Sequence, residues 1–184
     1  MTTPAPAIAQ IAAVFDCDGA DEYLGEPVTQ AEHMRQAAWL AEQSGAPGHL
    51  VAAALLHDVG HFRGVVRTVA RGTGNVHHER GATWLGQWFG PEVTEPVRLH
   101  VDAKRYLCAT EAAYLGALSP ASLDSLGRQG GPMSATEASA FATRAHAPDA
   151  VRLRRLDDRA KLPGAPAPAV EHFLPVLGRL LTTP

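Results

Sequence analysis

The stretch Leu50-Val-Ala-Ala-Ala-Leu-Leu-His57-Asp58-Val-Gly-His61 decides how the fold of this chain is interpreted. Pro47 precedes it, and its apolar run predicts a buried helix over residues 50 to about 59. His57 and Asp58 then lie at the end of that helix, with His61 on the His57 face one turn later. Imidazole and carboxylate groups bind borderline and hard metals such as iron, manganese and zinc. The pair alone leaves a metal site and a chance dipeptide equally open.

Helix signals dominate on both sides of this stretch. Thr29-x-x-Glu32 is a capping box that opens a helix, and Gly45 closes that helix. We expect further helices over residues 75–89, over 94–108 with Pro96 in the first turn, over 150–161, over 170–181, and after the N-caps Ser119 and Ser134. Alternating apolar runs of useful length, the mark of strands, are absent. The sequence therefore predicts an all-α fold.

Length and charge limit the possible functions. The 184 residues are 46% hydrophobic and 19% charged, which is typical of a folded protein, and we expect a single domain over residues 1–184. Lys and Arg total 16 against 19 Asp and Glu, so the formal charge is -3. This balance disfavours nucleic acid or an anionic membrane as a partner. An anionic small-molecule ligand must be held by a few local cations.

Cysteine usage and the apolar runs indicate where the protein works. Cys17 and Cys108 are too far apart for a zinc ligand pair and too few for a disulfide scaffold, which fits a reducing interior. The chain has no Lys or Arg before Arg35, unlike a secretory signal. Its longest apolar run, residues 50–56, is too short to span a bilayer. We expect a cytoplasmic protein.

Nine histidines are the main chemical feature of the chain. Besides His57, the predicted helices carry His33, the pair His77-His78, His100 and the pair Asp157-Asp158. Ligands that converge from five helices form carboxylate-rich metal centres in helical bundles. Isolated histidines are more often ordinary hydrogen-bonded residues, so three are expected to lie outside the site: His49, His146 and His172.

The order of these residues resembles the metal-binding motif of the HD-domain superfamily, whose fold is an all-α bundle. Four longer motifs resemble the mixed-valent diiron oxygenases that cleave the carbon–phosphorus bond of 2-amino-1-hydroxyethylphosphonate and related 1-hydroxyphosphonates, which are relatives of myo-inositol oxygenase. These motifs are Tyr23-Leu-Gly-Glu-Pro-Val-Thr-Gln-Ala-Glu-His33, Leu99-His-Val-Asp-Ala-Lys-Arg-Tyr-Leu107, Gln129-Gly-Gly-Pro-Met133 and Arg152-Leu-Arg-Arg-Leu-Asp-Asp-Arg-Ala-Lys161. The resemblance covers residues 23–161.

The resemblance implies a set of six ligands for two iron ions, a mixed-valent Fe(II)/Fe(III) pair that uses O2 as co-substrate. The set consists of His33, His57, Asp58, His77, His100 and Asp157, with Asp58 as the bridge. Asp157 is preferred to Asp158 because Arg154 and Lys161 then flank it at helical spacings of three and four.

The choice between His77 and His78 rests on spacing alone. His77 stands four residues before Gly81-Ala82, as the resemblance requires. The resembling family has an acidic residue directly after this ligand, and here His78 occupies that place. His77 is therefore the expected ligand, and His78 marks a departure from the pattern.

A second set of residues has the chemistry to bind a tetrahedral dianion. Lys104 follows His100 by four residues, so both share one helix face. Ser122 and Ser125 lie near a helix start, where hydroxyl groups and backbone N–H groups bind phosphate and phosphonate. The expected substrate-binding residues are His61, Lys104, Ser122, Ser125 and Arg154. Solvated surface charges and a simple helix cap are the competing interpretations, above all for Ser125.

Tyr23 and Glu26 precede the first capping box, in a loop. In the resembling oxygenases, a Tyr and a Glu three residues apart close over the substrate-binding iron and leave it when substrate arrives. The resemblance implies this role for Tyr23 and Glu26. A Tyr packed on the bundle and a solvated Glu are the alternative.

By this resemblance the protein is an O2-dependent diiron oxygenase that converts a small 1-hydroxyphosphonate into a carboxylic acid and inorganic phosphate. One alternative is an HD-domain phosphohydrolase, in which a metal activates water against a nucleotide or other phosphate ester. Another is a nucleotide sensor without catalysis. The extra histidines, the Tyr23 and Glu26 pair and the Gln129 motif favour the oxygenase.

Overall fold

The computed structural model of the chain describes residues 6–23, 25–69 and 76–182 and confirms the all-α class. Among these residues only two isolated β-bridges occur, Glu22 with Thr29 and Phe89 with Leu181. The helices are α1 (Pro6–Asp18), α2 (Gln30–Gln43), α3 (Gly48–Leu56), the 3₁₀-helix η1 (Val59–His61), α4 (Arg63–Thr68), α5 (His77–Leu85), α6 (Pro91–Thr110), α7 (Ala112–Ala117), α8 (Pro120–Arg128), α9 (Ala135–Ala142), α10 (Ala147–Arg159) and α11 (Val170–Leu180).

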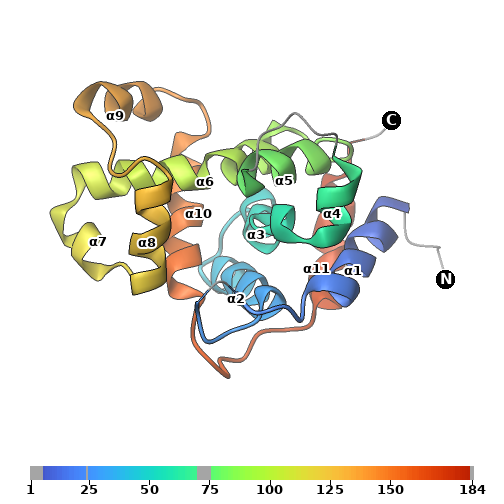
Figure 1. The fold of residues 1–184 in the computed structure, drawn as a ribbon. Coiled ribbons are helices and arrows are strands. Elements are labelled where there is room, and N and C mark those ends of the chain that lie inside the picture. Colours follow the sequence, from blue (N-terminus) through green and yellow to red (C-terminus); the bar gives the residue numbers. More distant parts are fainter. Residues whose placement is uncertain (1–5, 24, 70–75, 183–184) are drawn as a thin grey trace.

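Five helices form the centre of the molecule. The longest, α6, runs across it and packs against α3, α5 and α10, while α2 packs against α3 and α10 (Figure 1). Every residue of α3 from Leu50 to Leu56 is buried, as expected for an apolar run covered on all sides. This packing brings the C-terminal end of α3 close to α2, α5, α6 and α10.

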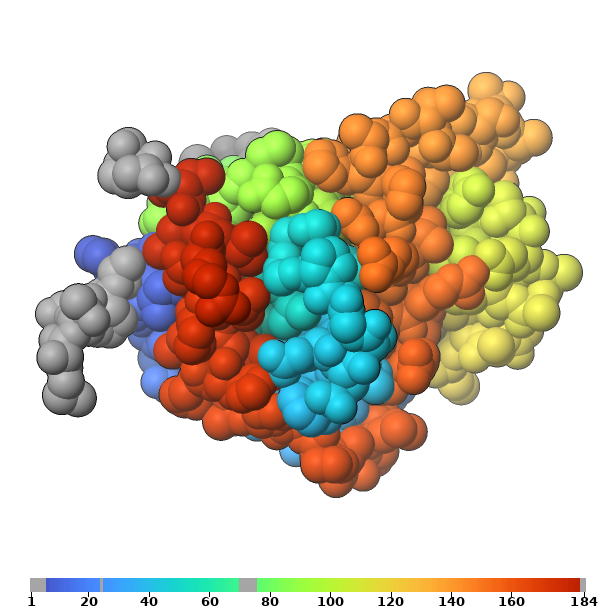
Figure 2. Space-filling model, turned by 180° about the vertical axis from the view of Figure 1, so that it is seen from behind, coloured from blue at the N-terminus to red at the C-terminus, as the bar shows by residue number. Residues whose placement is uncertain are grey.

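The remaining helices lie at two opposite ends of the bundle. Helices α7, α8 and α9 gather at one end, and α1, α4 and α11 lie at the other (Figure 1). Viewed from behind, α11 covers the surface beside α3, while α9 projects outward (Figure 2). A small apolar cluster that includes Leu99, Met133 and Phe141 holds α9 to α6. None of the described helices has the length and apolarity needed to cross a membrane.

The predicted helix caps are confirmed. Thr29 and Ser134 each form a complete capping box, and the Ser119 side chain accepts a hydrogen bond from the Ser122 backbone N–H. Gly45 follows the end of α2 with a positive φ of 68°, which only glycine adopts without strain.

Several predicted boundaries are wrong. Because α6 already begins at Pro91, Pro96 lies in its second turn instead of its first. Helix α10 covers Ala147–Arg159 instead of 150–161, since Ala147 and Pro148 already form its first turn. Helix α3 ends at Leu56, before the expected residue 59. The start expected at residue 75 lies outside the described residues.

Candidate metal centre and active-site cavity

Two pairs of histidines lie on either side of the Asp58 carboxylate. Asp58 Oδ2 lies 3.4 Å from His57 Nε2 and 3.8 Å from His33 Nε2. Its other oxygen, Oδ1, lies 3.4 Å from His77 Nε2 and 3.5 Å from His100 Nε2. Each pair is closely spaced, with Nε2 atoms 3.0 Å apart in the first and 3.2 Å apart in the second. Asp58 therefore has the placement of a carboxylate that bridges two cation sites.

Backbone carbonyl groups determine which nitrogen each imidazole presents. The Nδ1–H groups of His33, His57 and His100 donate to the carbonyl oxygens of Ala160, Ala54 and Val97, at 2.8, 2.9 and 2.7 Å. A carbonyl oxygen only accepts, so Nδ1 carries the proton in each ring. In the neutral rings the Nε2 lone pairs then face one another across the cluster, an arrangement that a shared cation stabilises.

The protonation states favour cation binding. Burial lowers the pKa of His33 to about 4 and that of His100 to about 3, so both rings are neutral near pH 7. Burial also opposes protonation of His57, but the neighbouring Asp58 and Asp157 carboxylates outweigh it and raise its pKa to about 9. A bound metal ion would replace that proton, because metal ligands must be deprotonated.

Two buried carboxylate oxygens lack a hydrogen-bond partner among the described residues. These are Asp58 Oδ1 and Asp157 Oδ1, and the latter lies 3.4 Å from His33 Nε2 and 3.9 Å from the Lys161 ammonium nitrogen, beyond hydrogen-bond distance. Burial opposes ionisation of both carboxyl groups, yet His57 beside Asp58 and Arg154 beside Asp157 hold each pKa below its usual range. Buried, ionised and unpartnered oxygens are costly unless a cation balances them. The donor set therefore fits two metal ions that accept nitrogen and oxygen ligands.

Gly60 permits a close approach of η1 to α5. A Cβ atom at this position would lie 1.9 Å from the His77 carbonyl oxygen and 2.8 Å from the Gly81 backbone nitrogen. Only glycine permits this approach, which brings the start of α5 against the turn that follows α3.

The position of His61 corrects a prediction. The sequence predicts His61 on the His57 face of one α-helix, but it belongs to η1, because the α-helix ends at Leu56. Its ring stacks on His77, with centroids 4.1 Å apart. His61 therefore lies on the His77 and His100 side of Asp58.

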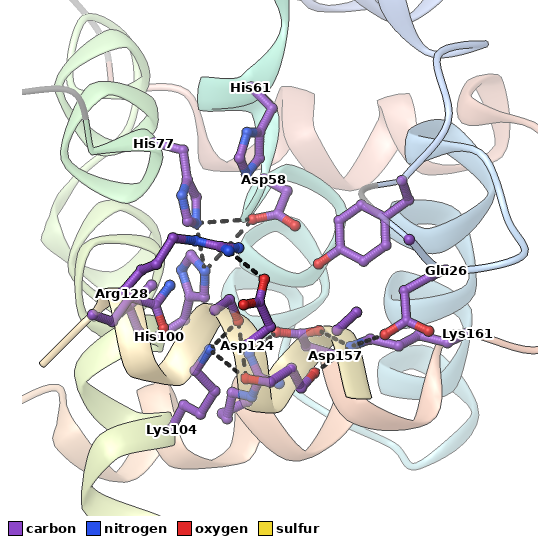
Figure 3. Close-up of a pocket in the computed structure, with 18 residues that line it drawn as sticks. Glu26, Asp58, His61, His77, His100, Lys104, Asp124, Arg128, Asp157 and Lys161 are labelled. Atoms are coloured by element: carbon purple, nitrogen blue, oxygen red, sulfur yellow. Dashed lines mark hydrogen bonds and ion pairs between the residues drawn. The ribbon is translucent and has the colours of Figure 1, made fainter. Parts of the chain in front are cut away.

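A cavity of about 470 Å³ opens onto this cluster. Asp58, His61 and His77 lie on one wall, while Lys104, Asp157 and Lys161 lie on the wall opposite (Figure 3). The five expected substrate-binding residues all line it, together with Tyr23 and Glu26. The structure thus brings the candidate metal ligands and the candidate anion-binding residues to one space.

Lys104 and Lys161, which lie on the same wall of the cavity, both form hydrogen bonds with α8. The buried Lys104 ammonium group donates to Ser125 Oγ at 2.7 Å, and burial together with the nearby Arg154 lowers the Lys104 pKa to about 8. The Lys161 ammonium group donates to Ser122 Oγ at 3.0 Å. Ser122 and Ser125 are therefore more than helix caps, because their hydroxyl groups contact the partly buried Lys161 and the buried Lys104.

Tyr23 and Glu26 lie over the cluster. The Tyr23 ring stacks on His33, with centroids 4.1 Å apart and planes 17° apart. Burial and then the Asp58 carboxylate raise the Tyr23 pKa, so the phenol keeps its proton near pH 7. Glu26 Oε1 accepts from Ser119 Oγ at 2.6 Å and lies 3.2 Å from Lys161 Nζ. Tyr23 and Glu26 belong to the loop that precedes α2. Tyr23 is held by its stacking on His33, and Glu26 by its contacts with Ser119 and Lys161.

Arg154 lies at the cavity wall but is bonded to carboxylates. Its Nη1 lies 2.7 Å from Asp157 Oδ2, while Nη2 and Nε contact Asp158. Only 4% of Arg154 is exposed, so these are buried charge pairs.

The histidines that were expected outside the site lie outside it. His49 pairs with Asp149 at 3.1 Å, and His172 pairs with Glu42 at 2.7 Å. His146 is the N-cap residue of α10. None of the three lines the cavity.

Some cavity residues are absent from the predicted site. The sequence identifies Lys161 only as a neighbour of Asp157, although its place in the Arg152 to Lys161 motif is a usable signal. Gln129 likewise stands in a motif without a predicted role. Asp124 and Arg128 also line the cavity and pair with each other across one helical turn. Nothing in the sequence distinguishes such a pair from a solvated one.

Comparisons with known proteins identify the family. The HD domain family matches residues 31–142. The chain is 43% identical over 173 residues to a 1-hydroxy-2-(trimethylamino)ethyl phosphonate dioxygenase (glycine-betaine-forming) from Leisingera caerulea, covering 93% of this chain and 88% of the relative. It is 42% identical over 159 residues to a hydroxymethylphosphonate dioxygenase from Gimesia maris, covering 85% of this chain and 79% of the relative.

Proposed function

The chain belongs to the HD-domain family, in the group that contains these phosphonate dioxygenases, and we propose that it is an oxygenase that cleaves the carbon–phosphorus bond of a small 1-hydroxyphosphonate. The products are a carboxylic acid and inorganic phosphate. The reaction balances with one O2, which accepts four electrons from the hydroxylated carbon, so no further reductant is consumed. One observation supports this proposal most directly. Lys104 and Ser125 line the same cavity as Asp58 and the two histidine pairs that flank it.

The proposed cofactor is a pair of iron ions, Fe(II) and Fe(III). When bound, this pair supplies the O2 chemistry and open positions for the substrate hydroxyl and phosphonate oxygens. The proposed ligands of one ion are His33, His57, Asp157 and Asp58 Oδ2, and those of the other are His77, His100 and Asp58 Oδ1. The unpartnered carboxylate oxygens and the facing Nε2 atoms support this assignment.

The choice of His77 over His78 follows the same geometry. His77 Nε2 lies 3.2 Å from His100 Nε2, whereas the His78 ring stands edge-on to the His77 ring, with centroids 5.3 Å apart. His77 also lies 3.4 Å from Asp58 Oδ1, the oxygen that faces the second histidine pair.

The protein supplies charge and orientation to the substrate. A phosphonate dianion in the cavity meets the Lys104 ammonium group and the hydroxyl groups of Ser122 and Ser125. Lys104 is mostly protonated near pH 7, since its lowered pKa is still about 8. Fixed donors that face the charged end of a ligand hold it in one orientation. His61 and Arg154 line the walls beside this group and complete the proposed binding residues.

Tyr23 and Glu26 are proposed to control access to the metal centre. Tyr23 covers His33 while its pKa, raised by burial, keeps the phenol neutral. Glu26 pairs with the Lys161 ammonium group at the cavity wall. An anion that enters the cavity therefore competes with Glu26 for that ammonium group. Substrate binding and displacement of the loop are thereby linked.

An anaerobic assay tests the reaction class. The protein is purified, its iron content is measured, and it is given hydroxymethylphosphonate or 1-hydroxy-2-(trimethylamino)ethylphosphonate. We expect O2 uptake and phosphate release in equal amounts and no phosphate release without O2. Undiminished phosphate release under anaerobic conditions would identify a metal-dependent phosphohydrolase, which the HD domain alone also allows.

A further inference from the structure

A chain of polar contacts joins the peripheral helix α7 to the cluster. The Tyr114 hydroxyl group donates to Asp158 Oδ2. The Arg154 guanidinium group donates to the same carboxylate through Nε, at 3.2 Å, and through Nη2. Its remaining nitrogen, Nη1, lies 2.7 Å from Asp157 Oδ2. Tyr114 is thus connected through two intervening side chains to a proposed metal ligand.

These contacts divide the two oxygens of Asp157. Oδ2 bonds to Arg154 and lies 4.0 Å from His57 Nε2, whereas Oδ1 has no hydrogen-bond partner among the described residues and lies 3.4 Å from His33 Nε2 and 3.9 Å from Lys161 Nζ. Rotation of the carboxylate would break the Arg154 contact. Arg154 therefore keeps Asp157 turned so that Oδ1 is the oxygen closer to the cluster histidines.

Asp158 holds Arg154 in turn. All three guanidinium nitrogens bond to protein groups, since Nε also lies 3.1 Å from the Tyr114 hydroxyl oxygen. A planar guanidinium bonded at two edges has little freedom to turn. The main role of the Arg154 guanidinium group is therefore to hold Asp157, and binding of a ligand in the cavity comes second.

Tyr114 is poorly explained by packing alone. It is the only partly buried residue of α7, whose other five residues are all exposed. Its hydroxyl group reaches a carboxylate adjacent in sequence to the proposed ligand.

We propose that Tyr114 and Asp158 are positioning residues for the metal centre, which act through Arg154 to hold the Asp157 carboxylate with Oδ1 toward the cluster. The inference rests on the proposed function for the identity of the metal centre. It predicts that removal of one hydroxyl group on α7 weakens metal binding at a site that Tyr114 does not touch. Loss of such outer partners typically lowers metal affinity about 10 to 100-fold.

Metal titration of metal-free protein tests this proposal without turnover. Mn²⁺ binding is measured for the wild type, Tyr114→Phe, Asp158→Asn and the control Tyr106→Phe, together with the melting temperature of each metal-free protein. Tyr106 also packs as an aromatic ring, against Phe141, and its hydroxyl group makes no hydrogen bond to another described residue. We expect one Mn²⁺ site to weaken about 10-fold in Tyr114→Phe and more in Asp158→Asn, with Tyr106→Phe unchanged.

The outcomes separate positioning from anchoring. Wild-type Mn²⁺ affinity in Tyr114→Phe would overturn the proposal, and a lower melting temperature with that affinity would assign Tyr114 to anchoring α7 alone. An equal loss in Tyr106→Phe would also overturn it. Because Mn²⁺ binding is measured without substrate or O2, failure of the oxygenase assay leaves this result intact, and the reverse holds as well.

Discussion

The Lys104 ammonium group donates a hydrogen bond of 2.7 Å to Ser125 Oγ, which joins a buried cation on α6 to α8, a helix that lines the cavity. Ser125 Oγ in turn donates to the Ser122 carbonyl oxygen at 3.0 Å. An ammonium group has three donors. Lys104 therefore retains donor capacity for an anion in the cavity while α8 holds its position.

Replacement of Lys104 by Ala is expected to weaken catalysis and to spare the metals. The variant loses the buried cation nearest to the proposed phosphonate position, and loss of one partner of a buried charge pair costs about 2 to 5 kcal/mol. The expected fall in kcat/KM is therefore at least tens-fold. Steady-state kinetics and iron analysis check this. Arg155→Ala, which removes an exposed cation of α10, serves as the control, and loss of iron from Lys104→Ala would contradict the assignment.

The alkaline limb of the pH profile is expected to report Lys104. Burial and the nearby Arg154 lower the Lys104 pKa to about 8, so the charge that attracts an anion is present below pH 8 and is lost as the pH rises through it. The value of kcat/KM, which reports the free enzyme, should therefore fall above about pH 8. Arginine stays protonated throughout this range, so Lys104→Arg should move the limb upward. A limb unmoved in that variant would belong to another group.

Alanine variants of the proposed ligands are expected to lose metal. His33→Ala, His57→Ala, Asp58→Ala, His100→Ala and Asp157→Ala should each bind fewer iron ions than the wild type, with Asp58→Ala affected at both positions because its two oxygens face different histidine pairs. Each loss should exceed the 10 to 100-fold effect of outer partners. His49→Ala, His146→Ala and His172→Ala should keep the wild-type iron content. If Asp157→Ala kept its iron and Asp158→Ala lost iron, Asp158 would be the ligand in place of Asp157.

A direct comparison of His77→Ala with His78→Ala checks whether His77 is the ligand, since His78 stands where the resembling family has an acidic residue. His77 Nε2 lies 3.4 Å from Asp58 Oδ1, so its removal should empty one metal position. The His78 ring lies edge-on to those of His77 and His100, with centroids 5.3 and 5.9 Å away, so its removal should leave metal binding within a few-fold of the wild type. Metal titration of both variants decides the assignment, and the reverse order of effects would name His78 as the ligand.

Local signals explain which parts of the fold are predictable. Thr29, Ser119 and Ser134 predict helix starts correctly because a cap depends on residues three positions away. The end of α3 at Leu56 has no such local signal, because a C-cap glycine such as Gly45 is absent there and the 3₁₀-helix η1 follows after Asp58. Helices α1, α4 and α7 escape prediction, because two are six residues long and the composition of α1 is apolar without a strong cap.

In the candidate site too, features with a local signal in the sequence are predictable, and features that depend on packing are not. The ligand types and their order along the chain are visible in the sequence, so the motif alone predicts that His33, His57 and Asp58 share one site. The resemblance implies Asp58 as the bridge, but which histidine pair faces each of its oxygens depends on how the helices pack. Tyr114 lies 44 residues from its Asp158 partner, and no local pattern connects them. Lys161 belongs to a recognisable motif, but its contacts with Glu26 and Ser122 depend on how the loop and α8 pack.

Gly60 provides a test of how the fold places the second histidine pair. In Gly60→Ala the added Cβ atom would lie 1.9 Å from the His77 carbonyl oxygen, and both atoms nearest to it belong to the α5 backbone. No side-chain rotation relieves this overlap, so α5 must move away from η1. Arg80, which donates to the Gly60 carbonyl oxygen at 2.9 Å, would move with it.

We expect Gly60→Ala to lose about 1 to 3 kcal/mol of unfolding free energy, as overpacked sites do. Metal binding should weaken mainly on the His77 and His100 side, because His77 is the first residue of α5 and the three atoms nearest to the added Cβ atom all belong to α5. Urea unfolding of metal-free protein and metal titration measure the two effects. Gly178→Ala in α11 is the matched control, since its Cβ atom meets nothing within 4 Å and alanine favours a helix by up to about 1 kcal/mol. Wild-type affinity for both metals in Gly60→Ala would show that the close approach of η1 to α5 is not what places His77.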